Sequence, residues 1–358
     1  MMYALKAERI ELPGSLEEIN RYLYANGMTD GLPVVPPSED RVLRMLEGTS
    51  LEADFEVASL PPEWAPATIE VIAINAVMAG CLPEHMPVLI TLVKAMAQPE
   101  FSLLGVLATT GGYAVSAMLN GPIRHELDIN CTNNLFGPGK LANATIGRAL
   151  RLFQLNIGGV IPGVTDKSCQ GWPGKYTICW GENEEGSPWG PYHTEKGFSP
   201  TDSTVTIFAA DSFCKIRAGG TVGRGALQSL AYGTRPVGAV LNGWGNGAKP
   251  FVALGPETAN QIARDNISKA EVREYFFEHA RSSFDDLYQP ESGEKISFEE
   301  MQKRCTNLWA DKTVSIADRA NDISVVVAGG PGRQSVWFPA NARSMPVTML
   351  IDPLLKRT

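Results

Sequence analysis

The chain has 358 residues, 44% of them apolar, so it is long enough to bury a large core in one domain or two. Acidic residues outnumber basic ones by 39 to 31, the net charge is −8, and the lysines and arginines are scattered along the sequence. This pattern excludes the basic footprint of a nucleic-acid-binding protein.

The N-terminal sequence MMYALKAERIELPG carries charges at Lys6, Glu8 and Arg9, where a secretory signal needs an apolar run. The most apolar region, residues 67–97, is interrupted by charged residues and by the sequence PEHMP. Neither half reaches the roughly 18 to 20 apolar residues that cross a bilayer. We therefore expect a cytoplasmic protein without membrane contact, in which this region forms buried helices.

Helix signals dominate the first part of the chain. Residues 15–27 begin with a serine cap, carry a glutamate three places on and end at a glycine, as a short helix does. Further helices are expected at 38–48, 66–82 and 87–97. We predict a mostly helical N-terminal region, residues 1–98, packed on a core domain of residues 99–358.

From Leu103 onward the sequence changes to short β-rich runs bounded by glycine and proline, which is typical of buried strands. The runs are LLGVLATTGG, AVSAMLNGP, STVTIFAAD, PVGAVLNGWG, PFVALGP and ISVVVAGGPG. Helical stretches lie between them at 139–157 and 268–281. Strands that alternate with helices predict an α/β fold.

Three segments share one pattern: a buried strand, then Gly-Pro, then a polar stretch that closes on Asn. They are residues 114–130, 249–266 and 322–341. Glycine permits a sharp turn, and proline at the first helical position loses no hydrogen bond. Either one βα corner is repeated three times, or three unrelated turns use the same ordinary chemistry.

If the corners are repeats, their free backbone N–H groups and helix N-termini converge on one crevice, which suits a carboxylate or another small anion. This makes the corner residues, together with two nearby cations, candidate substrate-binding positions. They are Asn120, Gly121, Gly255, Gly329 and Gly330, with Arg124 and Lys140.

Residues 179–193, CWGENEEGSPWGPYH, combine carboxylates with one of only four histidines. These ligand types suit a divalent metal, although the spacing matches no standard metal motif. A solvated surface loop is the alternative, but the aromatic and proline residues favour a packed loop suited to acid–base work. We predict catalytic roles or metal ligation for Glu182, Glu184, Glu185 and His193.

Other candidate catalytic groups lie close to the first corner or in a later loop. His125 follows the corner directly and is next to Glu126. Cys131 and Cys169 are candidate nucleophiles, provided that an imidazole or a helix N-terminus lowers the thiol pKa. The alternative for each cysteine is a buried, inert thiol.

Four phrases, TDGLPVVPP, GKLANATIGRALRL, NIGGVIPGVTD and GPETANQIARDNISKAEVREYFFEHAR, together resemble a sparsely characterised bacterial family. That family is related to, or found alongside, the proteins named for a Sec/Cys-Gly-Ser-Cys motif. The naming motif is absent here, and its nearest counterpart is Ser168-Cys169 preceded by a lysine. The resemblance implies that any thiol chemistry belongs to a separate small Cys-bearing subunit.

We expect an enzyme that acts on a small anionic organic molecule by lyase or hydrolase chemistry, with Glu/His acid–base groups and with or without a divalent metal. One alternative is the large subunit of a thiol-dependent, reductase-like complex. Another is a small-molecule binding protein. A homo-oligomer is also expected, because apolar α/β chains often share surface.

Overall fold

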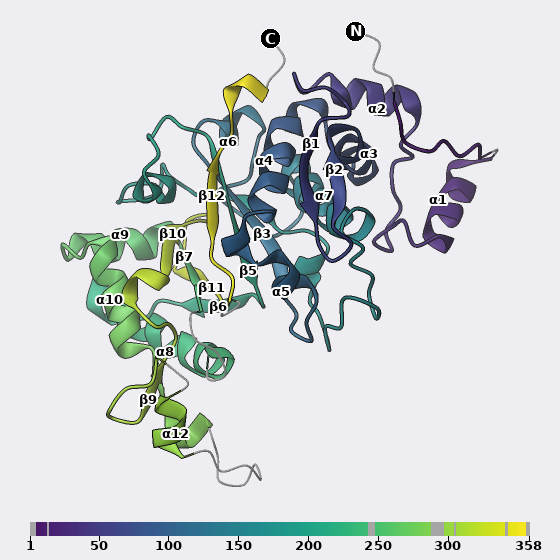
Figure 1. Cartoon of the computed structure of the whole chain (residues 1–358). Coiled ribbons are helices and arrows are strands. Elements are labelled where there is room, and N and C mark those ends of the chain that lie inside the picture. The colour runs from purple at the N-terminus through teal and green to yellow at the C-terminus, as the bar shows by residue number, and fades with distance from the viewer. Residues whose placement is uncertain are drawn as a thin grey trace.

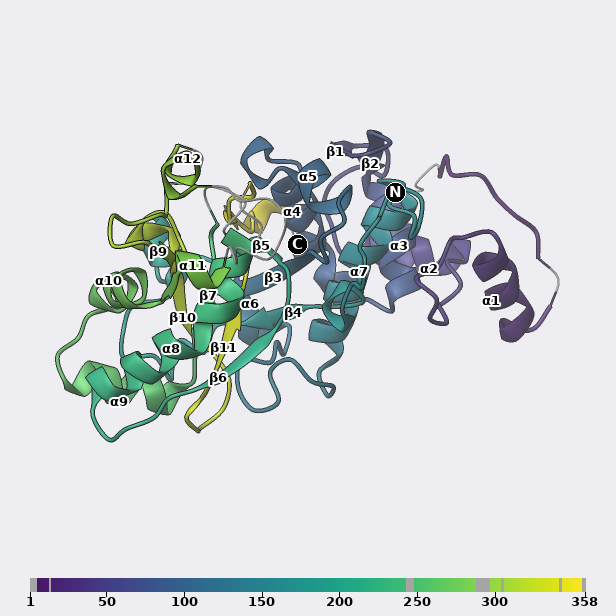
Figure 2. The ribbon, with the colours of Figure 1, turned by 90° about the horizontal axis from the view of Figure 1, so that it is seen from below.

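The computed structural model describes residues 5–12, 14–242, 248–287, 297–303, 306–340 and 343–355, with backbone only for residues 236–242. The predicted mixed α/β fold is confirmed. Two four-stranded sheets lie face to face, and helices cover both outer faces, so that the molecule has four layers (Figure 2).

The N-terminal region contains the four expected helices and one small sheet. The helices are α1 (Leu16–Ala25), α2 (Glu39–Leu46), α3 (Ile69–Ala79) and α4 (Met86–Met96). Strands β1 (Glu56–Leu60) and β2 (Ala65–Thr68) form an antiparallel pair that the sequence did not predict. Helix α3 starts later than expected because residues 65–68 belong to β2, and the Thr68 side chain caps its first turn.

The first large sheet has the strand order β12-β5-β3-β4, and the second has the order β10-β7-β11-β6. The first comprises β3 (Ala114–Asn120), β4 (Cys179–Gly181), β5 (Thr204–Ala210) and β12 (Val347–Leu350). The second comprises β6 (Cys214–Arg217), β7 (Phe251–Leu254), β10 (Ser324–Val327) and β11 (Gln334–Phe338).

The two sheets repeat one pattern of pairing. In the first, β3 runs parallel to β4 and antiparallel to β5, and β5 runs antiparallel to β12. In the second, β7 runs parallel to β10 and antiparallel to β11, and β11 runs antiparallel to β6. The chain is therefore built from two similar halves, each of which gives its last strand, β6 or β12, to the sheet of the other half.

The two crossings between the sheets meet each other. Ala210, at the end of β5, forms an antiparallel bridge with Ala340, just beyond β11. The backbone N–H of Asp211 donates to the Pro339 carbonyl over 2.9 Å. The segment that leads from β5 to β6 and the segment that leads from β11 to β12 therefore pair with each other where they pass from one sheet to the other.

Strict alternation along the strands builds the layers. Phe208 and Ala210 of β5 face the other sheet, whereas Val205 and Ile207 face the helices. Between the sheets, the Phe208 ring stacks on that of Phe251 from β7, with centroids 3.9 Å apart. Helices α4 and α7 (Leu141–Asn156) cover the first sheet, and α8 (Gly223–Asn242) and α10 (Lys269–His279) cover the second.

The remaining elements lie at the ends of this sandwich. Short helices α5 (Leu103–Leu107) and α6 (Ile123–Glu126) flank β3, and α9 (Pro256–Arg264) follows β7. A small lobe with its own core extends away from the sheets at the lower left of Figure 1. It contains β8 (Arg281–Ser283), α11 (Phe284–Leu287), α12 (Phe298–Gln302) and β9 (Thr313–Ser315).

Two expected strands are helices. The run that starts at Leu103 forms α5, in which Leu103, Val106 and Leu107 are buried and Leu104 is exposed, a helical spacing. The run 236–245 is the end of α8 as far as Asn242, and its remaining residues lie outside those described. A short apolar run is compatible with a buried helix as well as with a strand. The run 236–245 continues a helix that begins at Gly223, so its first part is helical.

The three Gly-Pro corners fall into two kinds. The first two follow β3 and β7, the equivalent strands of the two halves, and lead into α6 and α9. The third follows β10, where the chain turns directly into β11. The internal repeat is thus real for two corners, and the third is a strand-to-strand turn, where Gly329 has a positive φ of 92°.

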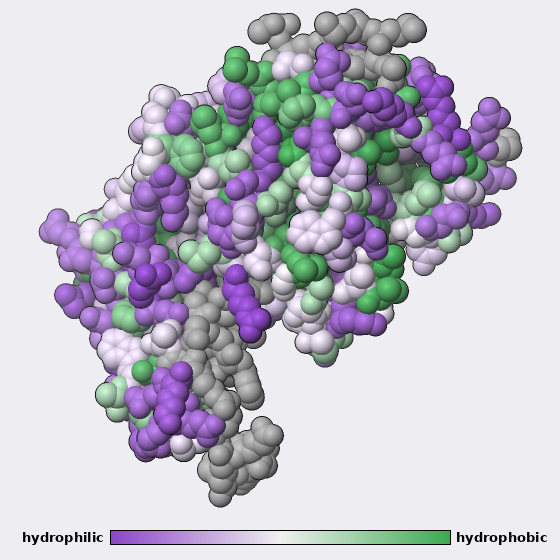
Figure 3. All heavy atoms as spheres, in the orientation of Figure 1, coloured by the Kyte–Doolittle hydropathy of each residue, from purple (hydrophilic) through white to green (hydrophobic). Residues whose placement is uncertain are grey.

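In the described part of the chain, no single helix is both long and apolar enough to cross a membrane. Residues 83–96 and 99–107 are together long and apolar enough, but the chain bends by 71° between them. In the face shown in Figure 3, polar side chains dominate over α9 and α10, whereas hydrophobic residues are more frequent over the first half.

Candidate functional site

The predicted loop 179–193 leaves β4 at Gly181 and lies against the first Gly-Pro corner. The Glu184 carboxylate accepts hydrogen bonds from the Gly121 backbone N–H, over 2.8 Å, and from the Asn120 side-chain amide, over 2.9 Å. The corner therefore binds an anion, as its geometry predicts. The anion is supplied by the chain itself.

Arg124 of α6 is the cation at the middle of this loop. Its guanidinium lies 2.9 Å from carboxylate oxygens of both Glu184 and Glu185 and donates to the Glu182 carbonyl over 2.8 Å. Burial opposes ionisation of Arg124, but the two carboxylates raise its pKa above its ordinary value. The hydrogen bond from Arg124 lowers the pKa of Glu185 to about 2. His125 is exposed and lies 3.0 Å from the same Glu185 carboxylate.

Glu182 and His193 are fully buried. Glu182 Oε2 accepts from the Asn120 amide over 2.6 Å and from the Tyr192 N–H over 2.7 Å. Its Oε1 has no hydrogen-bond partner among the described residues and lies 4.0 Å from Lys269 Nζ. Burial raises the pKa of Glu182. We call this set (Asn120, Arg124, Glu182, Glu184 and Glu185) the Arg124 centre.

His193 does not join the Arg124 centre through any described hydrogen bond. It lies in the 3₁₀ turn Tyr192–Lys196, where its Nε2 is 3.0 Å from the Ser199 carbonyl oxygen. In the described part of the chain, no three His, Cys, Asp or Glu side chains are grouped so that they hold a metal ion. The predicted metal site for Glu182, Glu184, Glu185 and His193 therefore has no preformed centre there.

The two candidate nucleophilic cysteines have different surroundings. Cys131 is buried, with its sulfur 3.8 Å from Arg124 Nη1. Burial raises the pKa of Cys131 despite this nearby cation, which opposes formation of a thiolate. Cys169 is exposed, and its backbone N–H donates to the Thr110 carbonyl over 3.0 Å.

The third corner does approach the first. The Gly329 N–H donates to the Cys131 carbonyl over 3.0 Å, and the Asn183 side chain donates to the Gly329 carbonyl over 2.9 Å. A Cβ at Gly330 would collide with the side chain of Asn133. Close packing explains Gly330, and the positive φ of 92° explains Gly329.

Three further predicted residues have other surroundings. The Gly255 N–H donates to the Ser335 hydroxyl of β11 over 3.2 Å. Lys140 is exposed and pairs with Asp128 over 2.6 Å. Glu126, the last residue of α6, is exposed.

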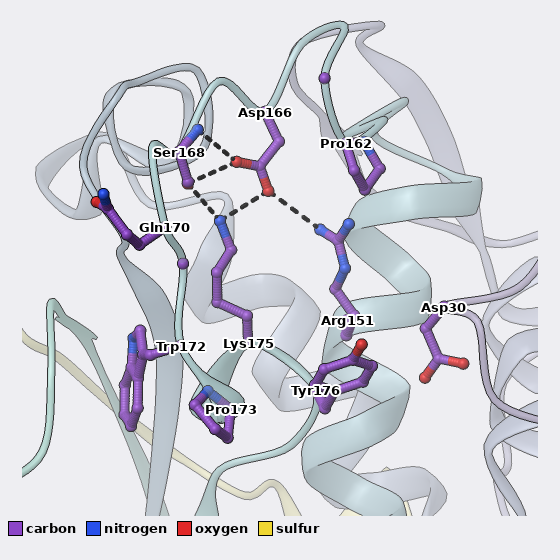
Figure 4. A pocket seen from close by; sticks show the side chains of 12 residues that line it. Asp30, Arg151, Pro162, Asp166, Ser168, Gln170, Trp172, Pro173, Lys175 and Tyr176 are labelled. Carbon is purple, nitrogen blue, oxygen red and sulfur yellow. Dashed lines mark hydrogen bonds and ion pairs between the residues drawn. The ribbon is translucent and has the colours of Figure 1, made fainter.

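A cavity of about 530 Å³ opens elsewhere, between α7 and the loop that precedes β4 (Figure 4). No predicted site residue lines it. The lining residues are Asp30, Arg151, Pro162, Gly163, Asp166, Ser168, Gln170, Gly171, Trp172, Pro173, Lys175 and Tyr176. We call it the Arg151 cavity.

Asp166 is the focus of polar contacts in the Arg151 cavity, and three side chains point toward it in Figure 4. Lys175 Nζ lies 2.7 Å from Asp166 Oδ2, and Arg151 Nη1 lies 4.0 Å from the same oxygen. The Ser168 hydroxyl lies 2.6 Å from Asp166 Oδ1 and accepts from Lys175 Nζ over 2.7 Å. Although burial opposes it, Lys175 and Ser168 lower the pKa of Asp166.

The charges around the Arg151 cavity do not balance. Arg148 and Asp30 form a bidentate pair at 2.8 Å, and Lys175 pairs with Asp166. Arg151 is then the third cation against two carboxylates, and none of the five side chains is more than 19% exposed. Nη1 of Arg151 and Nε1 of Trp172 have no hydrogen-bond partner among the described residues. A buried cation that its neighbours leave short of acceptors favours an anion close to it.

Sequence reasoning missed these residues because Arg151 lies on a helix whose other residues are typical of a core, and the rest lie in a loop. A usable signal was present: Asp166, Ser168 and Lys175 stand within ten residues, beside an aromatic Gly-Pro loop. Three segments far apart in the sequence meet here, through Asp30, Arg151 and Asp166.

Comparison with protein-family models, with curated proteins and with solved structures gave no match.

Proposed function

We propose that the chain is an enzyme that binds a small anionic organic molecule in the Arg151 cavity and acts on it by hydrolase chemistry. The observation that carries the proposal is the unbalanced positive charge of Arg151 in the wall of a 530 Å³ cavity. Buried arginine binds carboxylates well, because its planar donors match their two oxygens.

The lining supports a molecule with an apolar part as well as an anionic group. Trp172, Pro173 and Tyr176 offer apolar surface at one side of the cavity, and Arg151 and Lys175 offer donors at the other (Figure 4). Six of the twelve lining residues are polar or charged, so the cavity suits a small molecule that combines a polar group with an apolar part. An aromatic monocarboxylate such as benzoate is a suitable probe of this arrangement.

Hydrolase chemistry fits these groups better than lyase chemistry does. A lyase needs a base strong enough to remove a proton from carbon, whereas the pKa of Asp166 is lowered by Lys175 and Ser168. A hydroxyl already hydrogen-bonded to the carboxylate is an easier proton donor. The thiol-dependent alternative instead places the reactive cysteine on a partner subunit, so that turnover by the purified chain alone separates the two. Homo-oligomerisation stays a prediction of the sequence.

Calorimetric titration of the full chain with benzoate, and with its neutral isostere benzamide, tests the binding. We expect benzoate to bind at least tenfold more tightly than benzamide, and Arg151→Gln to remove that preference. Arg151→Lys keeps the charge and should retain part of it, and Lys140→Gln, outside the cavity, should leave it unchanged. Equal affinities for the two probes would exclude the anion site.

Turnover is tested with 4-acetoxybenzoate, an ester that carries the carboxylate, by following the release of acetate. We expect release that depends on Arg151 and is unchanged in Cys169→Ser. Binding of benzoate without hydrolysis of this or related carboxylate esters would support the small-molecule binding protein instead.

A further inference from the structure

The Ser168 hydroxyl is in contact with three polar groups, which is more than a loop serine needs for its structure. Its Oγ lies 2.7 Å from Lys175 Nζ, 2.6 Å from Asp166 Oδ1 and 2.8 Å from the Gly111 carbonyl oxygen. Ser168 is half-buried and lines the Arg151 cavity. A serine between an ammonium and a carboxylate, in the wall of a cavity, has the surroundings of an activated nucleophile.

We infer that Ser168 is the nucleophile of an acyl-transfer reaction, with Asp166 as the base and Lys175 and Arg151 as the cations that stabilise the transition state. This inference rests on the proposed function, because it needs a substrate in the Arg151 cavity. It specifies the substrate class as an ester or amide that also carries an anionic group.

The proton of Ser168 has a defined destination. A hydroxyl carries one proton, and two acceptors lie within reach, Gly111 O and Asp166 Oδ1. The carboxylate is the closer and is charged, so it is the stronger acceptor. Lys175 donates a hydrogen bond to Ser168 Oγ. An ammonium has no lone pair, so Lys175 cannot accept the proton while it remains charged.

The reaction then balances in two steps. Ser168 Oγ bonds to the acyl carbon, its proton passes to Asp166, and the leaving group departs with that proton, so that an acyl ester of Ser168 remains. Water next attacks the same carbon and gives its proton to Asp166. Ser168 Oγ leaves with that proton, and the acid product is released.

The cations are placed for the charge that develops. In the resting site Lys175 Nζ lies 2.7 Å from both Asp166 Oδ2 and Ser168 Oγ. When Asp166 accepts the proton, negative charge moves to the acyl oxygen, and Lys175 is released to donate to it. Fixed cations in a partly buried site stabilise such charge more than water does.

The structure also fixes the relative positions of these groups. The Ser168 N–H donates to Asp166 Oδ1 over 3.2 Å, which holds the two residues in one turn. The following residue, Cys169, is tied to Thr110 through its backbone. Ser168 therefore keeps its place beside Asp166 without a bound molecule.

Phenylmethanesulfonyl fluoride tests the inference directly on the full chain. Its reaction forms a bond between Ser168 Oγ and sulfur, breaks the sulfur–fluorine bond, releases fluoride and passes the hydroxyl proton to Asp166. We expect mass spectrometry to show Ser168 modified about 100-fold faster than Ser212, since a positioned base contributes about 10² to 10⁴ in rate. Ser212 is a matched control, because it is also half-buried and its hydroxyl contacts the sulfur of Cys214, over 3.6 Å, rather than a carboxylate among the described residues.

Benzoate should slow the modification of Ser168 and leave that of Ser212 unchanged. Asp166→Asn should reduce the Ser168 rate to that of Ser212, with its melting temperature measured alongside because it also loses an ion pair. Equal rates for the two serines in the wild-type chain, or a Ser168 rate that Asp166→Asn leaves unchanged, would overturn the inference.

The two proposals fail separately. Benzoate binding without selective modification of Ser168 removes the nucleophile and leaves the anion site. Selective modification of Ser168 that benzoate does not affect removes the anion site and leaves the nucleophile.

Discussion

The Arg124 centre and the Arg151 cavity each hold a buried arginine beside carboxylates, and they differ in how far those carboxylates satisfy the arginine. In the Arg124 centre, Glu184 and Glu185 satisfy the guanidinium and the corner N–H together. In the Arg151 cavity, Asp166 is closer to Lys175 than to Arg151, and free volume remains. A dense set of acidic residues thus marks a closed structural junction, and the sparser set marks the candidate site.

The largest effect on stability is expected from a substitution in the Arg124 centre. Arg124→Gln leaves Glu184, which is 12% exposed, without its cation. We expect the free energy of unfolding to fall by about 3 to 5 kcal/mol, as for other broken buried ion pairs, measured by urea denaturation. Benzoate affinity of the folded fraction should not change; a large loss of affinity with little loss of stability would reverse the two assignments.

The same substitution at the other arginine should have the opposite profile. Arg151→Gln removes a charged donor to the ligand, worth about 1.5 to 3 kcal/mol, which is roughly a 10- to 150-fold rise in the Kd for benzoate. Stability should change less than in Arg124→Gln, because Lys175 still pairs with Asp166. Calorimetry and denaturation on the same preparation check both halves of this statement.

Glu182→Gln tests the Arg124 centre through the pH dependence of stability. The pKa of Glu182 is raised by burial, so between its unfolded and folded values the native state holds a proton that the unfolded state has lost. Stability is therefore lost as pH rises through that window. We expect Glu182→Gln to gain about 0.5 to 2 kcal/mol at pH 7 and nothing below the unfolded pKa. Denaturation curves at several pH values measure this, and a variant less stable at neutral pH would contradict it.

The smallest effect is expected at Lys140. Its pair with Asp128 is exposed on both sides. Lys140→Gln should alter the free energy of unfolding by no more than about 0.5 kcal/mol and leave benzoate binding unchanged. A clear loss of binding would restore Lys140 to the candidate site.

The sequence predicts the local structure well where one segment carries its own signals. The capping boxes at Ser15 and Ser268 and the apolar strands β3, β5, β7 and β10 are examples. Strands β6 and β12 are short and partly exposed, so no apolar run in the sequence predicts them. Their exchange between sheets depends on pairing between residues more than 100 positions apart, which local reasoning does not reach.

The candidate site shows the same limit. The anion-binding character of the first corner and Arg124 could be predicted from residue types and turn chemistry. That the bound anions would be Glu184 and Glu185 of the same chain could not, because it depends on the path of the loop after β4. Arg151 was overlooked because it lies on a helix whose other residues read as core.

The exchange of last strands also bears on how the protein is made. When residues up to Ala210 have emerged from a ribosome, the edge of β5 lacks β12, which is synthesised about 140 residues later. An unpaired strand edge exposes backbone N–H and C=O groups that can pair with another chain. We therefore expect the β5 edge to stay unpaired until Val347–Leu350 has been synthesised, and a truncation before Val347 to aggregate more than the full chain.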